Sequence, residues 1–265
     1  MSAPVLQIDG LTIGFGSTAV VRGVSLDLHA GRVQGLAGES GSGKTVTAMS
    51  VLGLLPRTAT VTGSIRLGDV DLIGLRRRSL SAVRGRRVAM VFQDPSASLH
   101  PQIRIGAQLT DHVRRHLRLD AKRARAHAIE LLERVQVPDP EEALSRYPHQ
   151  FSGGQRQRIA IAIALACDPE VLLADEPTTA LDVTVQAGIL QLLRDLALER
   201  QLAVLLVTHD LGVMSAIADD VAVMRAGLIV ESGTREQLFT APQHEYTREL
   251  LAALPGAQVA NGDTE

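Results

Sequence analysis

The chain has 265 residues, of which 45% are hydrophobic and 21% are charged, and its formal net charge is −2. A chain of this size and composition can bury a full core and fits one large globular domain, alone or with an insertion. The small net charge excludes a global attraction to nucleic acid or to an acidic membrane, and the single cysteine, Cys167, excludes an internal disulfide and a multi-cysteine metal site.

Neither a targeting segment nor a membrane span is expected. The first 20 residues lack the basic start and apolar block of a secretory signal. The longest uninterrupted apolar run, residues 159–167, has nine residues, whereas a bilayer takes about 20 to cross. Any role at a membrane is therefore expected to depend on a partner protein.

The first third of the chain has the pattern of β-strands. Residues 5–8, 23–28 and 62–67 alternate apolar with polar side chains or carry β-branched ones, as half-buried strands do. Residues 88–92 form a continuous apolar run, which is typical of a strand buried on both faces.

Between a predicted strand at residues 32–37 and a predicted helix at residues 47–52 lies a stretch that fits the phosphate-binding pattern G-x-x-x-x-G-K-[ST]. Its glycines let successive N–H groups point at one anion at a helix N-terminus. Lys44 is expected to reach the β- and γ-phosphates of a nucleotide, and the Thr45 hydroxyl to bind Mg²⁺. The predicted nucleotide contacts here are Gly38, Glu39, Ser40, Gly41, Ser42, Gly43, Lys44, Thr45 and Val46.

The scarcity of lysine supports this interpretation. The chain contains 25 Arg and only two Lys, Lys44 and Lys122. A compact ammonium fits between phosphate oxygens where a planar guanidinium would not. The lysine at position 44 is therefore unlike the generic positive charge of this chain.

Beyond residue 103 the pattern changes to a helical period, which continues to residue 147 and is interrupted at Pro138 and Pro140. A long helix then follows Ser152. Further along, the chain predicts a buried strand, a helix and another strand, at residues 171–174, 182–200 and 203–207. Strands that alternate with helices indicate a mainly parallel sheet covered on both faces. The small and polar tail, residues 257–265, is expected to fray.

Two carboxylates, Asp175 and Glu176, follow the strand predicted at residues 171–174. At the carboxyl end of a central strand, Asp175 would face the Mg²⁺ held by Thr45. Glu176 could polarise a water in line with the γ-phosphate.

A second anion-binding helix N-terminus is predicted at Ser152, Gly153, Gly154 and Gln155. Ser152 is a natural N-cap, and the two glycines leave backbone N–H groups bare. Because one ATP needs only one such cradle, two cradles in one chain suggest that each ATP is shared between two chains.

Together these motifs resemble the nucleotide-binding domain of the ATP-binding cassette (ABC) family over essentially the full chain. Residues 152–155 match the signature of that family, with Phe151 where leucine is more usual. The resemblance implies a P-loop NTPase of the α/β class, with a RecA-like core, an antiparallel β subdomain and an inserted α-helical subdomain at about residues 97–155, in an ABC ATPase domain at residues 1–256. It also implies roles for four further residues: Gln93 as a contact of Mg²⁺ and water, Asp182 at a dimer seam, His209 at the γ-phosphate, and Phe15 stacked on adenine.

The resemblance narrows to the group of oligopeptide, dipeptide and nickel importers. Three segments are similar to that group: residues 92–101, 146–151 and 175–186. The closing segment of the group is similar to residues 242–248. His100 stands for a common asparagine and Glu245 for a proline, and the chain lacks the C-terminal cysteine cluster of many members, which excludes an iron–sulfur site.

This narrower resemblance implies an ATPase that uses ATP and Mg²⁺ to drive uptake of peptides or nickel. Its implied partners are integral membrane permeases, through them a solute-binding protein, and a second copy or a paralogue. It would lie peripherally at the cytoplasmic face of the membrane and bind no nucleic acid.

The alternative is a soluble ABC ATPase of a non-transport complex. Gln93 and Ser152 are 59 positions apart, which is too few for the coiled coil that DNA-repair members insert there, and translation factors carry two cassettes rather than one. An ATPase of a phosphonate-degrading complex fits the same motifs and stays open. A degenerate regulatory cassette is disfavoured because Lys44, Asp175, Glu176 and His209 are all present.

The remaining polar clusters are interpreted as structural. The arginines at residues 76–78, 84, 86 and 87 lack interleaved aromatics and indicate a solvated or subunit-facing edge. His112 and His116 lie among arginines that would repel a cation. Asp219 and Asp220 are expected at a corner between a helix and a strand.

Overall fold

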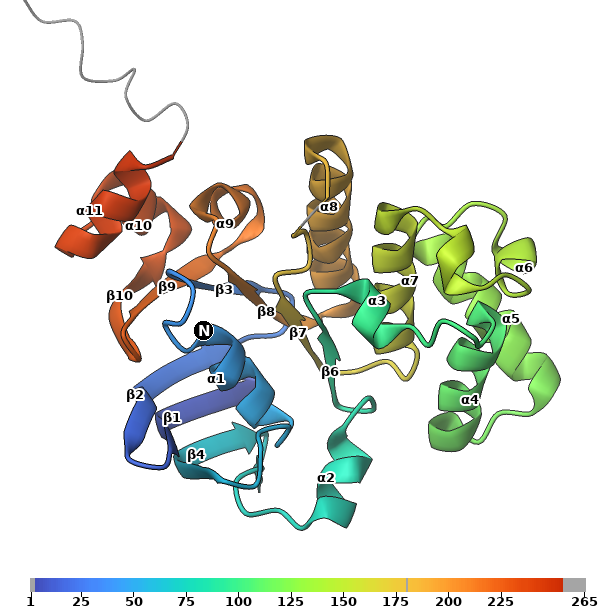
Figure 1. The fold of residues 1–265 in the computed structure, drawn as a ribbon, viewed down its shortest axis with the longest axis horizontal. Coiled ribbons are helices and arrows are strands. Elements are labelled where there is room, and N and C mark those ends of the chain that lie inside the picture. Colours follow the sequence, from blue (N-terminus) through green and yellow to red (C-terminus); the bar gives the residue numbers. More distant parts are fainter. Residues whose placement is uncertain (1–2, 180, 255–265) are drawn as a thin grey trace, which may run out of the picture. The chain divides into compact units, whose positions relative to one another are not determined.

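The computed structural model describes residues 3–179 and 181–254, drawn in Figure 1. The chain divides into two compact units. The first comprises Met1–Gly74 and Leu205–Glu265, and the second comprises Leu75–Val204. The tail predicted to fray, residues 257–265, and the end of the predicted ATPase domain at residue 256 lie outside the described residues.

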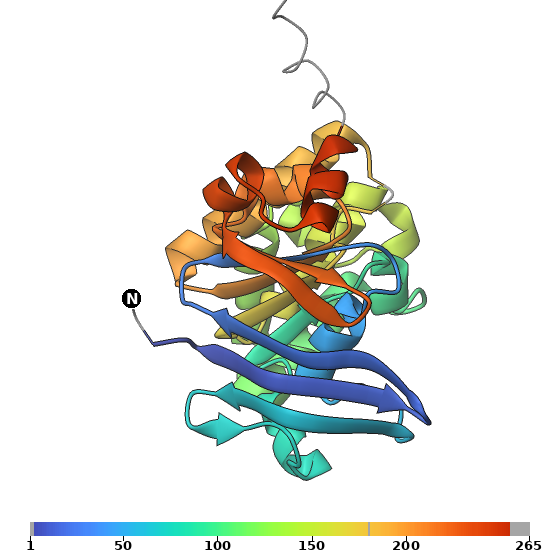
Figure 2. The same ribbon diagram turned by 90° about the vertical axis from the view of Figure 1, so that its left-hand side faces the viewer.

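The first unit contains an antiparallel sheet with the strand order β2-β1-β4-β5, seen from the side in Figure 2. Its strands are β1 (Leu6–Phe15), β2 (Thr18–Leu28), β4 (Ala59–Leu67) and β5 (Val70–Asp71). In β1 the buried residues are Leu6 and Ile8 and, further along, Leu11 and Ile13. Each pair is two positions apart, because side chains of a strand point alternately to its two faces. The predicted antiparallel β subdomain is confirmed.

A second sheet in the first unit has the strand order β10-β9-β3-β8. It is formed by β3 (Val33–Ala37), β9 (Asp220–Arg225), β10 (Leu228–Thr234) and the part of β8 (Ala203–Thr208) from Leu205 onward. β3 and β9 are parallel, whereas β9 and β10 form an antiparallel hairpin. The helices of this unit are α1 (Lys44–Val51), α9 (Leu211–Ile217), α10 (Arg235–Thr240) and α11 (Glu245–Ala252).

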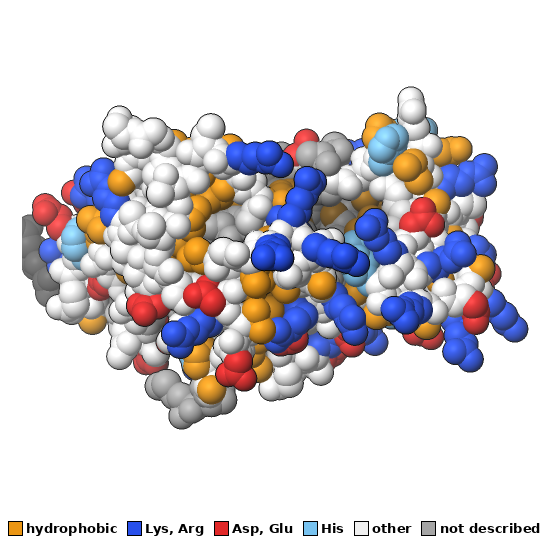
Figure 3. Space-filling view, turned by 90° about the horizontal axis from the view of Figure 1, so that it is seen from below, with side chains coloured by type: hydrophobic (Ala, Val, Ile, Leu, Met, Phe, Trp, Pro, Cys, Tyr) orange, Lys and Arg blue, Asp and Glu red, His pale blue; other side chains and the backbone are white. Residues whose placement is uncertain are grey.

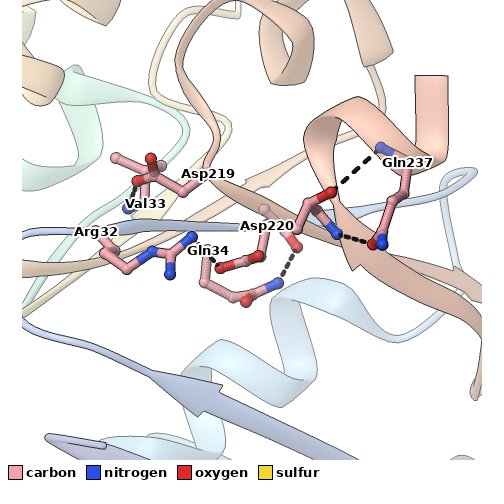
Figure 4. A network of polar contacts seen from close by, with 8 residues as sticks. Arg32, Val33, Gln34, Asp219, Asp220 and Gln237 are labelled. Atoms are coloured by element: carbon pink, nitrogen blue, oxygen red, sulfur yellow. Dashed lines mark hydrogen bonds and ion pairs between the residues drawn. The ribbon is translucent and has the colours of Figure 1, made fainter. Parts of the chain in front are cut away.

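The corner predicted at Asp219 and Asp220 lies between α9 and β9 (Figure 4). Asp219 Oδ2 accepts a hydrogen bond from the backbone N–H of Val33 at 2.8 Å. Asp220 forms an ion pair with Arg32 at 2.9 Å. Both carboxylates therefore fasten the start of β9 to the start of β3, which confirms the structural interpretation of this acidic pair.

The second unit contains β6 (Val88–Val91), which is parallel to β7 (Val171–Asp175). Phe92, predicted as the last strand residue, lies beyond β6 with 37% of its surface exposed, because the chain leaves the sheet there. Figure 1 shows the helices of this unit, which are α2 (Arg77–Val83), α3 (Pro95–Ser98), α4 (Ile105–Leu117), α5 (Ala121–Arg134), α6 (Pro140–Ala143), α7 (Gly153–Leu165) and α8 (Val183–Arg200).

The predicted helical stretch, residues 103–147, has one more break than its prolines indicate. Arg118 ends α4 in a left-handed conformation with φ of 56°, and Asp120 starts α5 as its N-cap by accepting from the N–H of Arg123 at 2.9 Å. An aspartate N-cap satisfies a backbone donor that the helix itself leaves unpaired. The turn at residues 118–120 therefore separates two helices that the periodicity merges into one.

Cys167 is buried, with 3% of its surface exposed. Burial raises the pKa of its thiol to about 11, against a smaller opposing effect of Arg86. Since the folded state favours the neutral thiol, this contribution to stability is present below the unfolded pKa of about 9 and is lost as the pH rises toward 11.

We therefore expect Cys167 to react with iodoacetamide at pH 8 only when the chain unfolds, because the thiolate is the reactive form. Alkylation measured by mass spectrometry should be at least about tenfold slower in buffer than in denaturant. Equal rates in the two conditions would show that the thiol is accessible in the native state.

Candidate functional site

The glycine-rich loop predicted from the sequence connects β3 to α1 in the first unit. α1 begins at Lys44, three residues earlier than the pattern predicts, and its N-cap Gly43 has a φ of 108° that favours glycine. The Lys44 ammonium donates hydrogen bonds to the carbonyl oxygens of Gly38 at 2.7 Å and Glu39 at 2.8 Å. The loop is thus closed around the lysine, and Thr45 lies exposed in the first turn of the helix.

Two glycines of the loop are also required by packing. A Cβ on Gly38 would lie 2.1 Å from the carbonyl oxygen of Met224. A Cβ on Gly43 would lie 2.8 Å from the Met224 methyl carbon and 3.0 Å from the Val20 carbonyl oxygen. The loop therefore lies directly against β9 and β2, so that its backbone has little room to shift.

Tyr246 on α11 also holds the loop. Its hydroxyl accepts a hydrogen bond from the backbone N–H of Glu39 at 3.1 Å. The ring is 5% exposed, and the guanidinium carbon of Arg225 lies 4.5 Å from its centroid, the geometry of a cation–π contact. Sequence reasoning missed this role, because Tyr246 follows Glu39 by 207 positions and no local pattern connects them.

The segment that carries Tyr246 is itself fastened to β10. The Glu231 carboxylate accepts hydrogen bonds from the N–H groups of Gln243 at 2.7 Å and His244 at 3.0 Å. His244 Nδ1 in turn accepts from the Tyr246 N–H at 3.1 Å. Burial alone would raise the pKa of Glu231, but the Thr247 side chain, these two backbone hydrogen bonds and the nearby His244 lower it overall. The tyrosine is therefore a fixed support for the loop.

We expect Tyr246→Phe to weaken ATP binding by about two- to tenfold, the effect of one hydrogen bond worth about 0.5–1.5 kcal/mol. The substitution keeps the ring and its contact with Arg225 and removes only the hydroxyl. The apparent KM for ATP should rise while kcat changes little. Tyr147→Phe, at the only other tyrosine of the chain, serves as the control. An unchanged KM would mean that the loop holds its shape without Tyr246.

In the second unit, Glu176 follows β7 and is held by two donors. Gln93 Nε2 donates to Glu176 Oε2 at 2.8 Å, and Thr179 Oγ1 donates to the same oxygen at 2.9 Å. Glu176 has a left-handed φ of 45°, a conformation that costs energy in a non-glycine residue and is frequent at functional sites. Two predicted site residues, Gln93 and Glu176, are thus in direct contact.

Ser152 caps α7, as predicted. Its hydroxyl accepts from the Gln155 N–H at 3.3 Å, and Gln155 Oε1 accepts from the Ser152 N–H at 3.0 Å, which forms a capping box. A Cβ on Gly154 would lie 2.4 Å from Cγ1 of Val185 on α8. The glycine at position 154 is therefore needed for the close approach of α7 and α8 as well as for a bare N–H group.

Asp182 is the N-cap of α8, since its Oδ1 accepts from the N–H of Val185 at 2.9 Å. The same valine contacts the position of Gly154, and Leu181 lies 3.5 Å from a Cβ placed on Gly153. The two segments predicted to meet a partner chain, residues 152–155 and Asp182, are thus packed together. Ala180 lies outside the described residues.

The other predicted site residues lie in the first unit. His209 is exposed between β8 and α9. Phe15 is half-buried at the end of β1, paired with Thr18 of the same hairpin. That hairpin meets the glycine-rich loop at Val20. The contact of Phe15 with adenine stays a prediction.

The residues predicted to hold Mg²⁺ carry suitable donor atoms. Thr45 offers a hydroxyl, Asp175 a carboxylate that is 5% exposed at the end of β7, and Gln93 its Oε1, since Nε2 is bonded to Glu176. Hydroxyl, carboxylate and amide oxygens are the ligands that Mg²⁺ prefers. Among the described residues, no group of three or more His, Cys, Asp or Glu side chains could hold a metal ion by itself.

A glycine-rich loop that ends in Lys-Thr between a strand and a helix, together with a second strand that ends in Asp-Glu, defines a P-loop NTPase. A family profile described as ABC transporter matches residues 21–179, and the chain belongs to that family. It is an ATP-hydrolysing cassette. No helix in the described part of the chain is both long and apolar enough to cross a membrane.

Curated relatives match most of the chain. The dipeptide transport ATP-binding protein DppD of Bacillus subtilis is 48% identical over 257 residues, which cover 95% of this chain and 77% of the relative. The oligopeptide transport ATP-binding protein OppD of the same organism is 43% identical, over 98% of this chain and 74% of the relative. The probable D,D-dipeptide transport ATP-binding protein DdpD of Escherichia coli is 44% identical, over 97% of this chain and 84% of the relative.

Solved structures agree with the fold. The cbiO1 protein of Clostridium perfringens, described as part of the ABC transporter complex cbiONQ, has a TM-score of 0.79 and 25% identity, and 96% of this chain and 97% of that chain are covered. The ATP-binding cassette MJ0796, in a dimeric post-hydrolysis state with ADP and Pi, has a TM-score of 0.76 and 27% identity. The match covers 87% of this chain and 98% of that chain.

Proposed function

We propose that this chain is the ATPase subunit of an importer of dipeptides or oligopeptides. The observation that carries the proposal is the 48% identity to a dipeptide transport ATP-binding protein over 95% of the chain. The relatives reported above are named for peptides. They therefore favour peptides over nickel, and a transporter over the soluble phosphonate-degrading complex.

In this proposal the first unit binds the triphosphate. The backbone of residues 38–43 and the Lys44 ammonium contact the phosphates, and Phe15 stacks on adenine. Thr45, Gln93 and Asp175 offer the oxygen atoms for Mg²⁺, which neutralises phosphate charge when bound. Glu176 orients the attacking water and receives its proton. Its carboxylate is already aligned by Gln93 and Thr179, so little rearrangement is needed.

We further propose that two cassettes, identical or paralogous, share each ATP head to tail. The Ser152 N-terminus of α7 then faces the γ-phosphate bound to the partner's loop, and Asp182 lies at the seam. His209 acts with Lys44 and Glu176 and contacts the γ-phosphate bound to its own chain. The packing of Val185 against Gly154 links the segment at Ser152 to the segment at Asp182. The dimer of the similar cassette MJ0796 with ADP and Pi supports this arrangement.

The proposed docking site for the membrane permease is the segment at residues 94–147, within the helical subdomain proposed at about residues 97–155. It begins next to Gln93, whose contact with Glu176 makes it sensitive to the nucleotide, and it ends shortly before Ser152. Closure of the dimer would move this segment and with it the permease. The chain would then lie peripherally at the cytoplasmic face of the membrane, with the solute-binding protein reached through the permease.

Cysteine crosslinking tests this proposal. Ser98 is exposed, whereas Leu99 is 2% exposed, so Ser98→Cys is the suitable variant. The buried Cys167 adds little background. In membranes of the source cells, a crosslinker on Ser98→Cys should capture an integral membrane protein. Leu198→Cys, at a position 50% exposed on α8, is the control and should not. Capture of soluble proteins or nucleic acid only would contradict the transporter function.

The solute is tested separately with the purified permease complex. Its ATPase rate should rise when a binding protein loaded with peptide is added and should not respond to nickel. Stimulation by nickel alone would replace peptide as the solute and would leave the ATPase assignment intact.

A further inference from the structure

The charge of this chain is distributed unevenly. Residues 76–134 contain fourteen Lys and Arg against five Asp and Glu, whereas the rest of the chain contains thirteen against twenty-four. The whole basic segment belongs to the second unit. Figure 3 shows Lys and Arg side chains predominating over acidic ones on the face of that unit turned to the viewer.

Helix packing directs these charges outward. α2 buries Leu80 and Val83 and exposes Arg77 and Arg78, and Arg76 is exposed directly before the helix. α4 buries Leu109 and Val113 and exposes Arg114 and Arg115. The basic face defined here consists of Arg76, Arg77, Arg78, Arg86, Arg114, Arg115 and Arg118, which are all exposed.

The two parts of the basic face adjoin each other. A Cβ on Gly85, in the turn after α2, would lie 2.7 Å from Nε2 of His112 on α4. The His112 and His116 rings are 4.9 Å apart. Burial, followed by the charges of His116 and Arg115, lowers the pKa of His112. The arginines of α2, its following turn and α4 therefore form one continuous surface.

The charge of the basic face is not neutralised within the described part of the chain. Neighbouring arginines do have partners: Arg87 binds Glu170 at 2.5 and 2.9 Å, and Arg123 lies 3.6 Å from Asp120. None of the seven arginines of the basic face forms an ion pair with a described Asp or Glu. An unneutralised cationic surface attracts multivalent anions.

We propose that the basic face binds the phosphate headgroups of anionic phospholipids and holds the second unit against the membrane beside the permease. Clusters of four to eight Lys or Arg are the pattern that anionic lipid surfaces attract, and guanidinium groups pair with phosphate in bidentate fashion. The inference rests on the proposed function only in placing the chain at a membrane.

Two other partners fit this surface less well. Single-stranded nucleic acid binds platforms of basic and aromatic side chains, and residues 93–146 contain no Phe, Trp or Tyr. The cytoplasmic loops of membrane proteins carry an excess of Lys and Arg, so a permease loop is expected to dock on residues 94–147 away from Arg114, Arg115 and Arg118 rather than on the basic face. A lipid headgroup layer is the anionic partner present at the same place.

Vesicle sedimentation with the purified full chain tests the proposal. We expect binding to vesicles of phosphatidylcholine with phosphatidylglycerol, little binding to phosphatidylcholine alone, and loss of binding as salt is raised. Arg77→Glu, Arg78→Glu, Arg114→Glu and Arg115→Glu combined should reduce the partition by more than about tenfold, since one basic residue near such a surface contributes about fivefold.

The matched control reverses four exposed arginines of the first unit, Arg22, Arg57, Arg66 and Arg235, and should retain most of the binding. If the basic-face variant with four Glu substitutions does not fold, the same four arginines of the basic face are changed to Gln instead, which removes their charge without reversing it. Equal binding to both vesicle types, or an equal loss in the control, would overturn the proposal, and so would tighter binding to single-stranded RNA than to vesicles. Because the vesicles contain no permease, this result is independent of the Ser98 crosslink.

Discussion

Lys44→Ala is expected to reduce ATP hydrolysis by at least about 10²–10³-fold, the effect of removing a charged group that stabilises a phosphoryl transition state. The Lys44 ammonium is held at the carbonyl oxygens of Gly38 and Glu39. The only other lysine, Lys122, is exposed on α5 in the other unit. No other lysine of the first unit can therefore replace it, and ATP binding should fall together with turnover.

The measurement is phosphate release by the purified chain with ATP and Mg²⁺, alongside nucleotide binding. Lys122→Ala removes the same charge elsewhere and should leave both unchanged. Lys44→Arg should remain inactive, because a planar guanidinium does not fit where the ammonium is surrounded by the loop. Hydrolysis by Lys44→Ala near the wild-type rate would show that the loop is not the nucleotide site.

Glu176→Gln should retain ATP binding and slow hydrolysis by about 10²–10⁴-fold, the usual contribution of a general base. The amide oxygen of glutamine can still accept hydrogen bonds from Gln93 and Thr179, which now bind the carboxylate at 2.8 and 2.9 Å. The local geometry is thus preserved while the base is lost. With ATP and Mg²⁺ the variant should accumulate as a closed dimer.

Gel filtration with and without ATP measures that dimer, and single-turnover kinetics measure the chemical step. Glu199→Gln, at an exposed carboxylate on α8, is the control and should behave as wild type. Rapid hydrolysis by Glu176→Gln would refute its role as base. A variant that loses ATP binding would mean that Glu176 acts in binding instead.

Much of the fold was predictable because its signals are local. The alternation in β1, the apolar run of β7 and the Ser152 cap each depend on neighbouring residues, and such patterns report directly on strands and helix starts. The break at residues 118–120 was missed because Arg118 is an unusual residue for a left-handed helix end, where glycine is the usual signal.

The sequence by itself determined the class of this protein. The phosphate-binding loop is a local pattern of glycines followed by Lys and then Thr or Ser, and Asp-Glu directly follows a buried strand. Both patterns can therefore be recognised without a structure. Only the tertiary structure decided how these parts are supported. Tyr246 reaches Glu39 across 207 positions and Gln93 reaches Glu176 across 83.

The tertiary structure also explains Gly154, because Val185 on another helix leaves no room for a Cβ there. It likewise shows that the two parts of the basic face adjoin, because the turn at Gly85 after α2 contacts His112 on α4. Packing between distant segments depends on how their side chains fill space together. The residues next to each position in the sequence therefore do not predict it.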